Sequence, residues 1–281
     1  MLAQGVKRMT QILALFVALA GVGTLLYVLE WLFRPARSQP LWRSDSIVDL
    51  IYWLLTPLLA KTISKALGVA GAAMLLVFLG REAATRVSDG FGPVLLQPAW
   101  LILLELFLIG DLVGYWTHRL FHGRGLWRFH AVHHSSTQLD WLSALRVHPV
   151  NDALAKLAPA MVLAALGFPL KMLAGYTVFL ALYAMLLHTN VSWSFGPLRY
   201  LIASPLFHRW HHTREHEGQD TNFAPLFPLI DIAFGTFYMP AGEKPVRFGT
   251  VYTSVPRSFF GQLFFPFRWS KGRRRSAPAS A

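Results

Sequence analysis

Cysteine is absent from the 281 residues of the chain. The protein therefore forms no disulfide and holds no thiolate-ligated haem or cysteine-held iron–sulfur cluster. Any metal must be bound through nitrogen or oxygen. Charged residues are also scarce, at 14% against roughly 25% in an ordinary soluble domain, while hydrophobic residues make up 54%. This composition predicts a protein surrounded mainly by lipid.

Long apolar runs account for much of the chain. The run 11–33 carries one acidic residue, Glu30, in 23 positions, and a membrane-spanning helix needs roughly 20. The small-residue cleavage pattern of a signal peptide does not follow it, so we expect a retained anchor. Residues 98–116 predict a second span. Residues 154–170 and 172–187 predict a helical hairpin around Phe168-Pro169, with a short turn at Lys171.

Two further apolar runs, 47–59 and 66–79, are separated by Lys61 and Lys65. These lysines mark either a turn at the membrane surface or two snorkelling side chains within one helix, and both interpretations stay open. Only helices and closed barrels satisfy the backbone in hydrocarbon, and the alternation typical of barrel strands is absent. The sequence thus predicts an all-α, polytopic helical membrane protein with a histidine-rich helical cap on the cytoplasmic side.

We expect three parts that work as one integral unit. N-terminal transmembrane helices occupy residues 1–95, a catalytic region occupies 96–245, and a basic C-terminal tail occupies 246–281. The tail from Gly272 has the composition of a disordered segment.

Basic residues outnumber acidic ones by 26 to 14, giving a net charge of +12. Many lie near the histidines, which we interpret as the positive-inside bias of cytoplasmic loops rather than as nucleic-acid binding. The histidine side is therefore expected to face the cytoplasm, in a bacterial inner membrane or the endoplasmic reticulum. The basic residues near the histidines are Arg119, Arg124, Arg128, Arg146, Arg199, Arg209 and Arg214. Lys271, Arg273, Arg274 and Arg275 follow near the C-terminus.

Histidines are the most informative residues, because eight of them recur in three short motifs at helical spacing. HRLFH places two imidazoles four positions apart, on one face of a helix. In HAVHH and HRWHH, the first histidine is followed by two more, three and four positions later, which would share a helical face with it. Imidazole suits iron, zinc, copper and nickel, and a structural zinc site takes only four ligands, so eight or more argue for two metal ions. The eight are His118, His122, His130, His133, His134, His208, His211 and His212.

Several other polar residues stand near these motifs. Asp111 lies seven positions before His118, and we expect it to orient that imidazole. Asn190 is interpreted as a helix-end cap rather than a ligand. Asn222 and Asp231 either brace the third motif or serve in turns.

The three motifs, in this order on a polytopic chain, resemble the fatty acid hydroxylase superfamily, also called the sterol desaturase family. Neighbouring stretches fit as well: Asp111-Leu-Val-Gly-Tyr115, Arg146-Val-His148-Pro149, Asn222-Phe223 with the following Asp231, and Phe234-Gly235-Thr236. The resemblance covers roughly residues 100–240. Such motifs are specific for the superfamily and say little about the substrate.

The resemblance implies a non-haem centre of two Fe ions that uses O2 and external electrons to hydroxylate or desaturate a C–H bond of a lipid, such as a fatty acyl chain or a sterol. It implies that the eight motif histidines are catalytic metal ligands, joined by His148 and His188 as the extra histidines between motifs. Apolar residues of the hairpin, with Trp141 and Trp193, are candidates to line a substrate tunnel.

Electrons must come from a separate protein, because the chain has no His-Pro-Gly-Gly haem motif, no GxGxxG and no cysteine. A cytochrome b5-like or ferredoxin-like donor with an acidic face could dock on the basic surface. Arg124, Arg128 and Arg214 are the residues whose replacement should slow reduction.

Two other functions remain open. His212-Thr-Arg-Glu215-His216 matches the HxxEH motif of some zinc peptidases, which would make the protein a membrane zinc hydrolase. A metal-transfer protein would use the histidines as a relay. In the oxygenase interpretation, His216 is instead a solvated loop residue. Metal content and O2 consumption separate the three.

Overall fold

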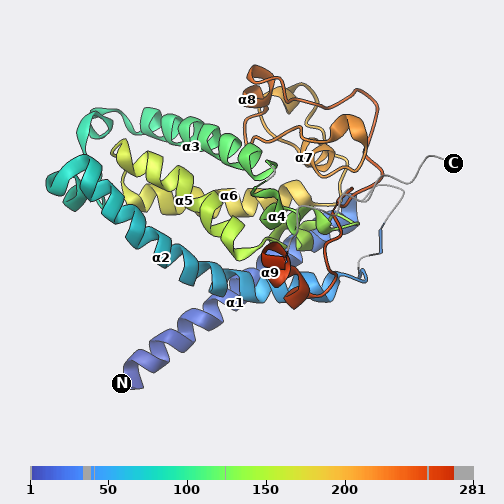
Figure 1. Cartoon of the computed structure of the whole chain (residues 1–281), viewed down its shortest axis with the longest axis horizontal. Helices are drawn as coiled ribbons and strands as arrows, with labels where there is room; N and C mark the ends of the chain where they lie inside the picture. The colour runs from blue at the N-terminus through green and yellow to red at the C-terminus, as the bar shows by residue number, and fades with distance from the viewer. Residues whose placement is uncertain (1, 34–38, 41, 124, 252, 269–281) are drawn as a thin grey trace.

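A computed structural model describes residues 2–33, 39–40, 42–123, 125–251 and 253–268 of the chain (Figure 1). Over these residues the protein is helical and contains no β-strand, apart from one isolated antiparallel bridge between Thr213 and Phe248. The predicted all-α class is confirmed. The expectation of disorder from Gly272 onward concerns residues outside the described ranges.

The described residues form five long helices, four of which build the body of the protein, and short helices that cover one end of it. The long helices are α1 (Leu2–Phe33), α2 (Ser46–Arg86), α3 (Ala99–Phe121), α5 (Pro149–Ala165) and α6 (Leu170–His188). The short ones are α4 (Trp127–His130), α7 (Pro205–His211), α8 (Pro228–Ala233) and α9 (Phe259–Arg268). The 3-10 turns are η1 (Gly92–Leu96), η2 (His133–Ser135), η3 (Trp141–Leu145), η4 (Gly196–Tyr200) and η5 (His216–Gly218).

Three of the described helices are long and apolar enough to cross a membrane: Phe16–Phe33 within α1, Ala99–Phe121 and Leu170–His188. Their outer faces carry exposed leucines such as Leu103, Leu108 and Leu182. Apolar side chains left exposed in such numbers are typical of contact with lipid. The chain is accordingly an integral membrane protein.

Helix α2 decides one question that the sequence left open. Residues 47–79 lie within one helix, so a turn at Lys61 and Lys65 is wrong, and Lys65 is an exposed helical residue. The backbone leaves helical geometry only at Gly80, with φ +79°. A left-handed φ is inexpensive for glycine alone, which explains why the helix bends there.

The predicted hairpin is confirmed with shifted ends. Helix α5 begins at Pro149 and α6 begins at Leu170, so Lys171 belongs to the first turn of α6 rather than to the connection. Gly167 makes the turn with φ +95°, and its carbonyl oxygen accepts a hydrogen bond from the backbone N–H of Phe91 at 3.0 Å.

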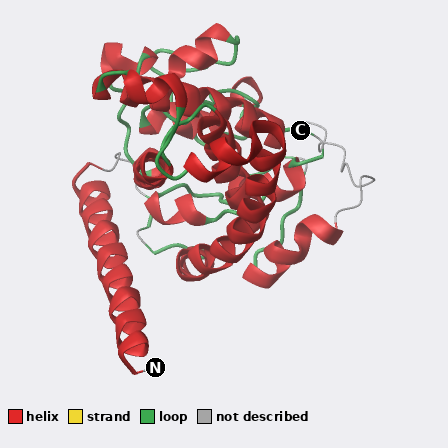
Figure 2. Cartoon of the chain, turned by 90° about the vertical axis from the view of Figure 1, so that its left-hand side faces the viewer, coloured by secondary structure: helices red, strands yellow, loops and turns green. Residues whose placement is uncertain are grey.

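The long helices α2, α3, α5 and α6 run along a common direction, with α5 packed between α2 and α3 (Figure 1). Their apolar contact includes Leu106, Leu163, Phe168 and Tyr176. The last turns of α3 and α6 and the first turns of α2 and α5 meet at the end of the bundle that α4 and α7 cover. Helix α1 extends away from this body in Figure 2. The arrangement brings the histidine motifs to one end.

Candidate metal centre

Nine histidines form two compact groups at the covered end of the bundle. In each group, one potential ligand atom per residue lies within 4.8 Å of every other. The five-histidine group consists of His118, His122, His130, His134 and His211. The four-histidine group consists of His133, His188, His208 and His212.

The motif histidines reach these groups from helix ends rather than from one continuous helix each. His118 lies in the last turn of α3, and His122 is the residue that ends that helix. The HAVHH motif is split between α4, which ends at His130, and the 3-10 turn η2. This break directs the adjacent side chains of His133 and His134 into different groups.

The HRWHH motif comes from α7, a two-turn helix capped by the hydroxyl of Ser204, which accepts a hydrogen bond from the backbone N–H of Phe207. His208 and His211 lie in this helix, and His212 is the residue that caps its C-terminal end. His188 is the last residue of α6. The resemblance named His188 as an extra histidine between the motifs, and the structure places it in the four-histidine group.

Backbone carbonyls fix the Nδ1 atoms of four of these rings. His118 Nδ1 lies 2.8 Å from the carbonyl oxygen of Phe223, and His211 Nδ1 lies 2.7 Å from that of Thr221. A carbonyl oxygen only accepts, so each Nδ1 carries the proton and each Nε2 keeps its lone pair. In the four-histidine group, the carbonyls of Ala184 and Arg146 act in the same way on His188 and His133, at 2.7 and 3.3 Å.

The Nε2 atoms point at one another. Those of His133 and His188 are 3.3 Å apart, although the carbonyl contacts leave neither with a proton to share. His122 Nε2 is buried without a hydrogen-bond partner. Facing lone pairs repel in a buried site, and a cation between them removes that repulsion. The arrangement therefore fits metal ions, and its all-nitrogen donor set suits first-row transition metals.

Burial keeps the rings neutral. It is the main cause that lowers the pKa of the seven group members outside the membrane-spanning helices well below the ordinary histidine value, and nearby imidazoles or other cations lower the pKa further in each case. Neutral imidazole is the form that binds metal. These seven are His122, His130, His133, His134, His208, His211 and His212.

The loop 220–227 carries the carbonyls that hold the five-histidine group. Asp231 accepts hydrogen bonds from the backbone N–H groups of Phe223 and Ala224, at 2.7 and 2.9 Å. Asn222, with φ +57°, donates to the carbonyl oxygens of Phe207 and Tyr238. The side chains of Asn222 and Asp231 therefore brace the motif histidines through this loop.

Asp111 has a different role from the one expected. Its carboxylate accepts hydrogen bonds from the backbone N–H groups of Leu226 and Phe227, at 2.8 and 2.7 Å, instead of bonding His118. The seven-residue spacing put both side chains on α3, but His118 meets the Phe223 carbonyl. Asp111 thus acts on His118 through the loop.

His148 does not join either group. Its Nδ1 accepts the backbone N–H of Val150 at 3.2 Å, which caps α5, and its Nε2 contacts the carbonyl oxygen of Leu263 at 3.0 Å. Both ring nitrogens are therefore occupied by backbone groups. The expected ligand role of His148 is corrected to a helix cap that also holds α9.

Two of the basic residues assigned to the surface are buried. The guanidinium of Arg146 pairs with Asp49 and Asp45, and Arg209 donates to the carbonyl oxygen of Leu139 at 3.0 Å. Burial lowers the pKa of Arg209 to about 10. Arg214 and Arg128 are exposed, whereas Arg124 and the residues from 271 onward lie outside the described ranges.

The HxxEH motif lacks the geometry that its zinc chemistry needs. Helix α7 ends at His211, and Glu215 bonds Thr213 and the backbone N–H of Val246, at 3.2 Å each. The motif therefore does not lie on one helix, and Glu215 lies outside both described groups. The side chain of His216 lies outside the described residues.

Sequence reasoning missed the partners that reach the groups from far along the chain. Asn151 Oδ1 lies 2.8 Å from His130 Nδ1, and Asp220 Oδ1 lies 2.8 Å from His122 Nδ1. Glu30 accepts hydrogen bonds from the backbone N–H groups of Asn190 and Trp141. Only the acidic charge of Glu30 within an apolar run gave a signal in advance.

Residues 103–236 match the family model described as fatty acid hydroxylase. Over 195 residues, the chain is 34% identical to the ornithine lipid hydroxylase OlsE of Rhizobium tropici, covering 69% of this chain and 58% of that protein. It is 32% identical to an alkylglycerol monooxygenase of Danio rerio, over 62% of this chain and 38% of that protein. It is 29% identical to an alkylglycerol monooxygenase of Caenorhabditis elegans, over 60% of this chain and 32% of that protein.

No solved structure matches the chain. The match to each of the three named relatives spans less than two thirds of that relative's own length. Residues 103–236 form a fatty acid hydroxylase domain that holds all nine grouped histidines. Through this domain, the chain belongs to the fatty acid hydroxylase superfamily.

Proposed function

We propose that the chain is an O2-dependent lipid hydroxylase in which the five-histidine and four-histidine groups each hold one iron ion. The observation that carries this proposal is the facing of Nε2 lone pairs, 3.3 Å apart between His133 and His188, whose Nδ1 protons are committed to carbonyls. Two irons bound there would supply the reduction of O2 and the oxidation of a C–H bond.

The residues of the chain do three things for such a centre. The carbonyl contacts fix each ring and its tautomer, so the ligand nitrogens are oriented before metal arrives. Burial at the end of the bundle excludes water, which protects a strong oxidant from side reactions. Neutral imidazoles would leave the charge of the ions uncompensated, so the centre would be strongly electrophilic.

The proposed substrate is a membrane lipid, and the proposed reaction is hydroxylation rather than desaturation. The names of the relatives in Rhizobium tropici and Danio rerio are those of a hydroxylase and a monooxygenase of lipids. Helices α3 and α6 carry His118 and His188 at their ends and are candidate membrane spans. A lipid held in the bilayer can thus approach the groups along the helices that bear the ligands.

We further propose that the histidine end faces the cytoplasm and takes electrons from an acidic, cytochrome b5-like or ferredoxin-like protein. The exposed side chains of Arg214 and Arg128 support this docking. Changing Arg214 to Ala should slow reduction and reduce its salt dependence, and unchanged kinetics would contradict the docking site. The chain has no native cysteine, so a single Arg214→Cys variant reports its membrane side by labelling with an impermeant thiol reagent.

The function is tested by metal analysis and lipid mass spectrometry on protein prepared without O2. We expect an iron pair in the Mössbauer spectrum and a lipid that gains one oxygen atom from isotopically labelled O2, both lost in His208→Ala. A lipid that loses two hydrogens without gaining the label would make the enzyme a desaturase. One zinc ion without O2 consumption would support the hydrolase, and labile metal without O2 consumption would support metal transfer.

A further inference from the structure

The described Nδ1 partners of both histidine groups lie within the hydroxylase domain 103–236. They are Asn151, Asp220, Thr221 and Phe223 for the five-histidine group, and Arg146 and Ala184 for the four-histidine group. In addition, two buried carboxylates outside that domain support the backbone around the four-histidine group. These are Glu30 on α1 and Asp49 on α2.

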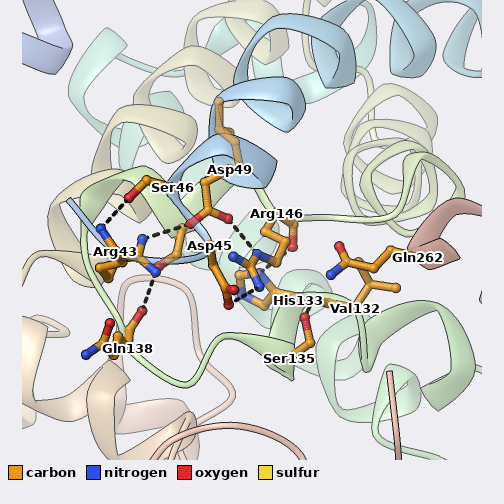
Figure 3. Close-up of polar contacts among 12 residues, drawn as sticks. Arg43, Asp45, Ser46, Asp49, Val132, His133, Ser135, Gln138, Arg146 and Gln262 are labelled. Atoms are coloured by element: carbon orange, nitrogen blue, oxygen red, sulfur yellow. Dashed lines mark hydrogen bonds and ion pairs between the residues drawn. The ribbon is translucent and has the colours of Figure 1, made fainter. Parts of the chain in front are cut away.

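Asp49 acts through Arg146. Its Oδ1 accepts a hydrogen bond from Arg146 Nε at 2.5 Å, and its Oδ2 accepts one from Arg43 Nη2 at 2.8 Å (Figure 3). Asp49 is fully buried and Arg146 is 2% exposed, so neither side chain has water as an alternative partner. The carbonyl oxygen of Arg146 is the acceptor for His133 Nδ1. Asp49 therefore fixes the residue that orients His133.

Arg43 extends this buried ion network to the segment between the second motif and Arg146. Its Nε donates to Asp140 Oδ2 at 2.6 Å. Its Nη1 donates to the carbonyl oxygen of Gln138 at 2.9 Å (Figure 3). The adjacent Leu139 carbonyl accepts from Arg209, the neighbour of His208 in the chain. One network thus connects the start of α2 with the backbone around His133 and His208.

Glu30 acts at the end of α6. Its Oε1 accepts hydrogen bonds from the backbone N–H groups of Asn190, at 2.8 Å, and Trp141, at 2.9 Å. Asn190 follows His188 by two residues, and His188 is the last residue of α6. A buried acceptor that satisfies two backbone donors fixes both segments. Glu30 therefore holds the chain as it leaves His188.

We propose that Asp49 and Glu30 are positioning residues for the four-histidine group, so that the N-terminal helices control the occupancy of one of two metal positions. The proposal rests on the proposed function, because it assumes a metal ion in each group. It gives helices α1 and α2, which lie outside the hydroxylase domain, a role in completing the metal centre. Loss of either carboxylate should empty one position and spare the other.

The first test measures iron per chain in purified Asp49→Asn, which keeps the shape of the side chain and removes its charge. Replacing a residue that holds a metal ligand in place weakens metal binding by about 10–100-fold. We therefore expect one of the two positions to be empty, which leaves about half of the wild-type iron content. The remaining iron should give the signal of an isolated ion in place of the coupled pair. Glu82→Gln is the matched control, because Glu82 lies on the same helix in an exposed pair with Arg86. It should retain both irons and their coupling.

The second test uses Glu30, which shares no described hydrogen bond with Asp49. Glu30→Ala removes the acceptor of two backbone donors and should also leave about half of the iron, whereas Glu30→Gln keeps an acceptor oxygen and should restore the pair. This pair of variants decides the question if Asp49→Asn cannot be recovered as monodisperse protein.

The outcomes separate the two proposals. A wild-type protein without paired iron contradicts the proposed function itself. A wild-type protein with paired iron, together with variants that keep both ions, overturns the positioning role alone. Variants that lose both ions in equal proportion also overturn it, because the proposal requires the five-histidine group to stay occupied.

Discussion

His133 and His188 are 55 residues apart in the chain, yet their Nε2 atoms lie 3.3 Å apart. Each Nδ1 donates to a carbonyl oxygen, that of Arg146 for His133 and that of Ala184 for His188. The two rings therefore meet with lone pairs facing, in a buried place that only the completed fold creates. A metal ion bound between the rings, as we propose, would remove the repulsion of the two lone pairs.

Removing one ring of this pair should remove one metal position. We expect His188→Ala to lose about half of the iron and all hydroxylase activity, because metal affinity depends on every ligand of the group. The control is His148→Ala, in which an imidazole that bonds only backbone groups is lost. It should keep both irons and lose about 1 kcal/mol of stability, the usual cost of a helix N-cap. Elemental analysis and thermal denaturation measure the two effects, and iron loss in His148→Ala would contradict the ligand assignment.

Most of the grouped histidines could be selected from the sequence because the motifs are local. The repeated motifs selected eight histidines, although HAVHH is split between α4 and η2, and the resemblance added His188 and His148. His188 lies in the four-histidine group, whereas His148 lies in neither, because a motif does not say which way a side chain at a helix start points. Its nitrogens turn to Val150 and Leu263 instead.

The groups that hold the histidine rings in place could not be predicted from the sequence, for a physical reason. Phe223 and Thr221 act through carbonyl oxygens, which every residue has, so their identity carries no signal. Asp49 and Arg146 pair across 97 positions, and nothing local indicates that an arginine of a basic loop is buried. Long-range polar partners become visible only when the helices are packed.

Acid should destabilise the metal-free protein. Burial lowers the pKa of His212 and His134 well below their value of about 6.5 in the unfolded chain, so unfolding takes up protons below that pH. The stability from these neutral rings is fully present above about pH 6.5 and is lost as the pH falls below it, by up to about 1.4 kcal/mol per pH unit for each proton taken up. Thermal denaturation between about pH 8 and about pH 6 checks this direction. A midpoint that rises on acidification would contradict it.

Asp111 should matter for stability and for the five-histidine group together. Asp111→Ala leaves the backbone N–H groups of Leu226 and Phe227 without their acceptor, at a cost of about 1–3 kcal/mol for each donor that stays unpaired. The loop that carries the Phe223 carbonyl then loosens, and iron content should fall. Glu105→Gln is the control on the same helix, because Glu105 bonds only Gln97 among its described partners. Equal melting temperatures for the two variants would show that the Asp111 contacts contribute nothing.

The spacing between α3 and α6 should be sensitive to a single methyl group at Gly110. A Cβ atom built there would lie 2.6 Å from the hydroxyl oxygen and from the Cζ atom of Tyr176, closer than real Cβ contacts allow. Tyr176 is buried, so its ring can move aside only by disturbing the apolar core between the helices. Overpacking of this kind costs typically about 1–3 kcal/mol.

Gly110→Ala should also lower turnover, because α3 carries His118 and α6 carries His188, one ligand of each group. The matched control is Gly175→Ala on α6, where a new Cβ would meet nothing within 4 Å. We expect the control to match the wild-type protein in thermal denaturation, iron content and product formation, while Gly110→Ala falls in all three. Indistinguishable behaviour of the two alanine variants would mean that the close approach of α3 and α6 does not set the geometry of the histidine groups.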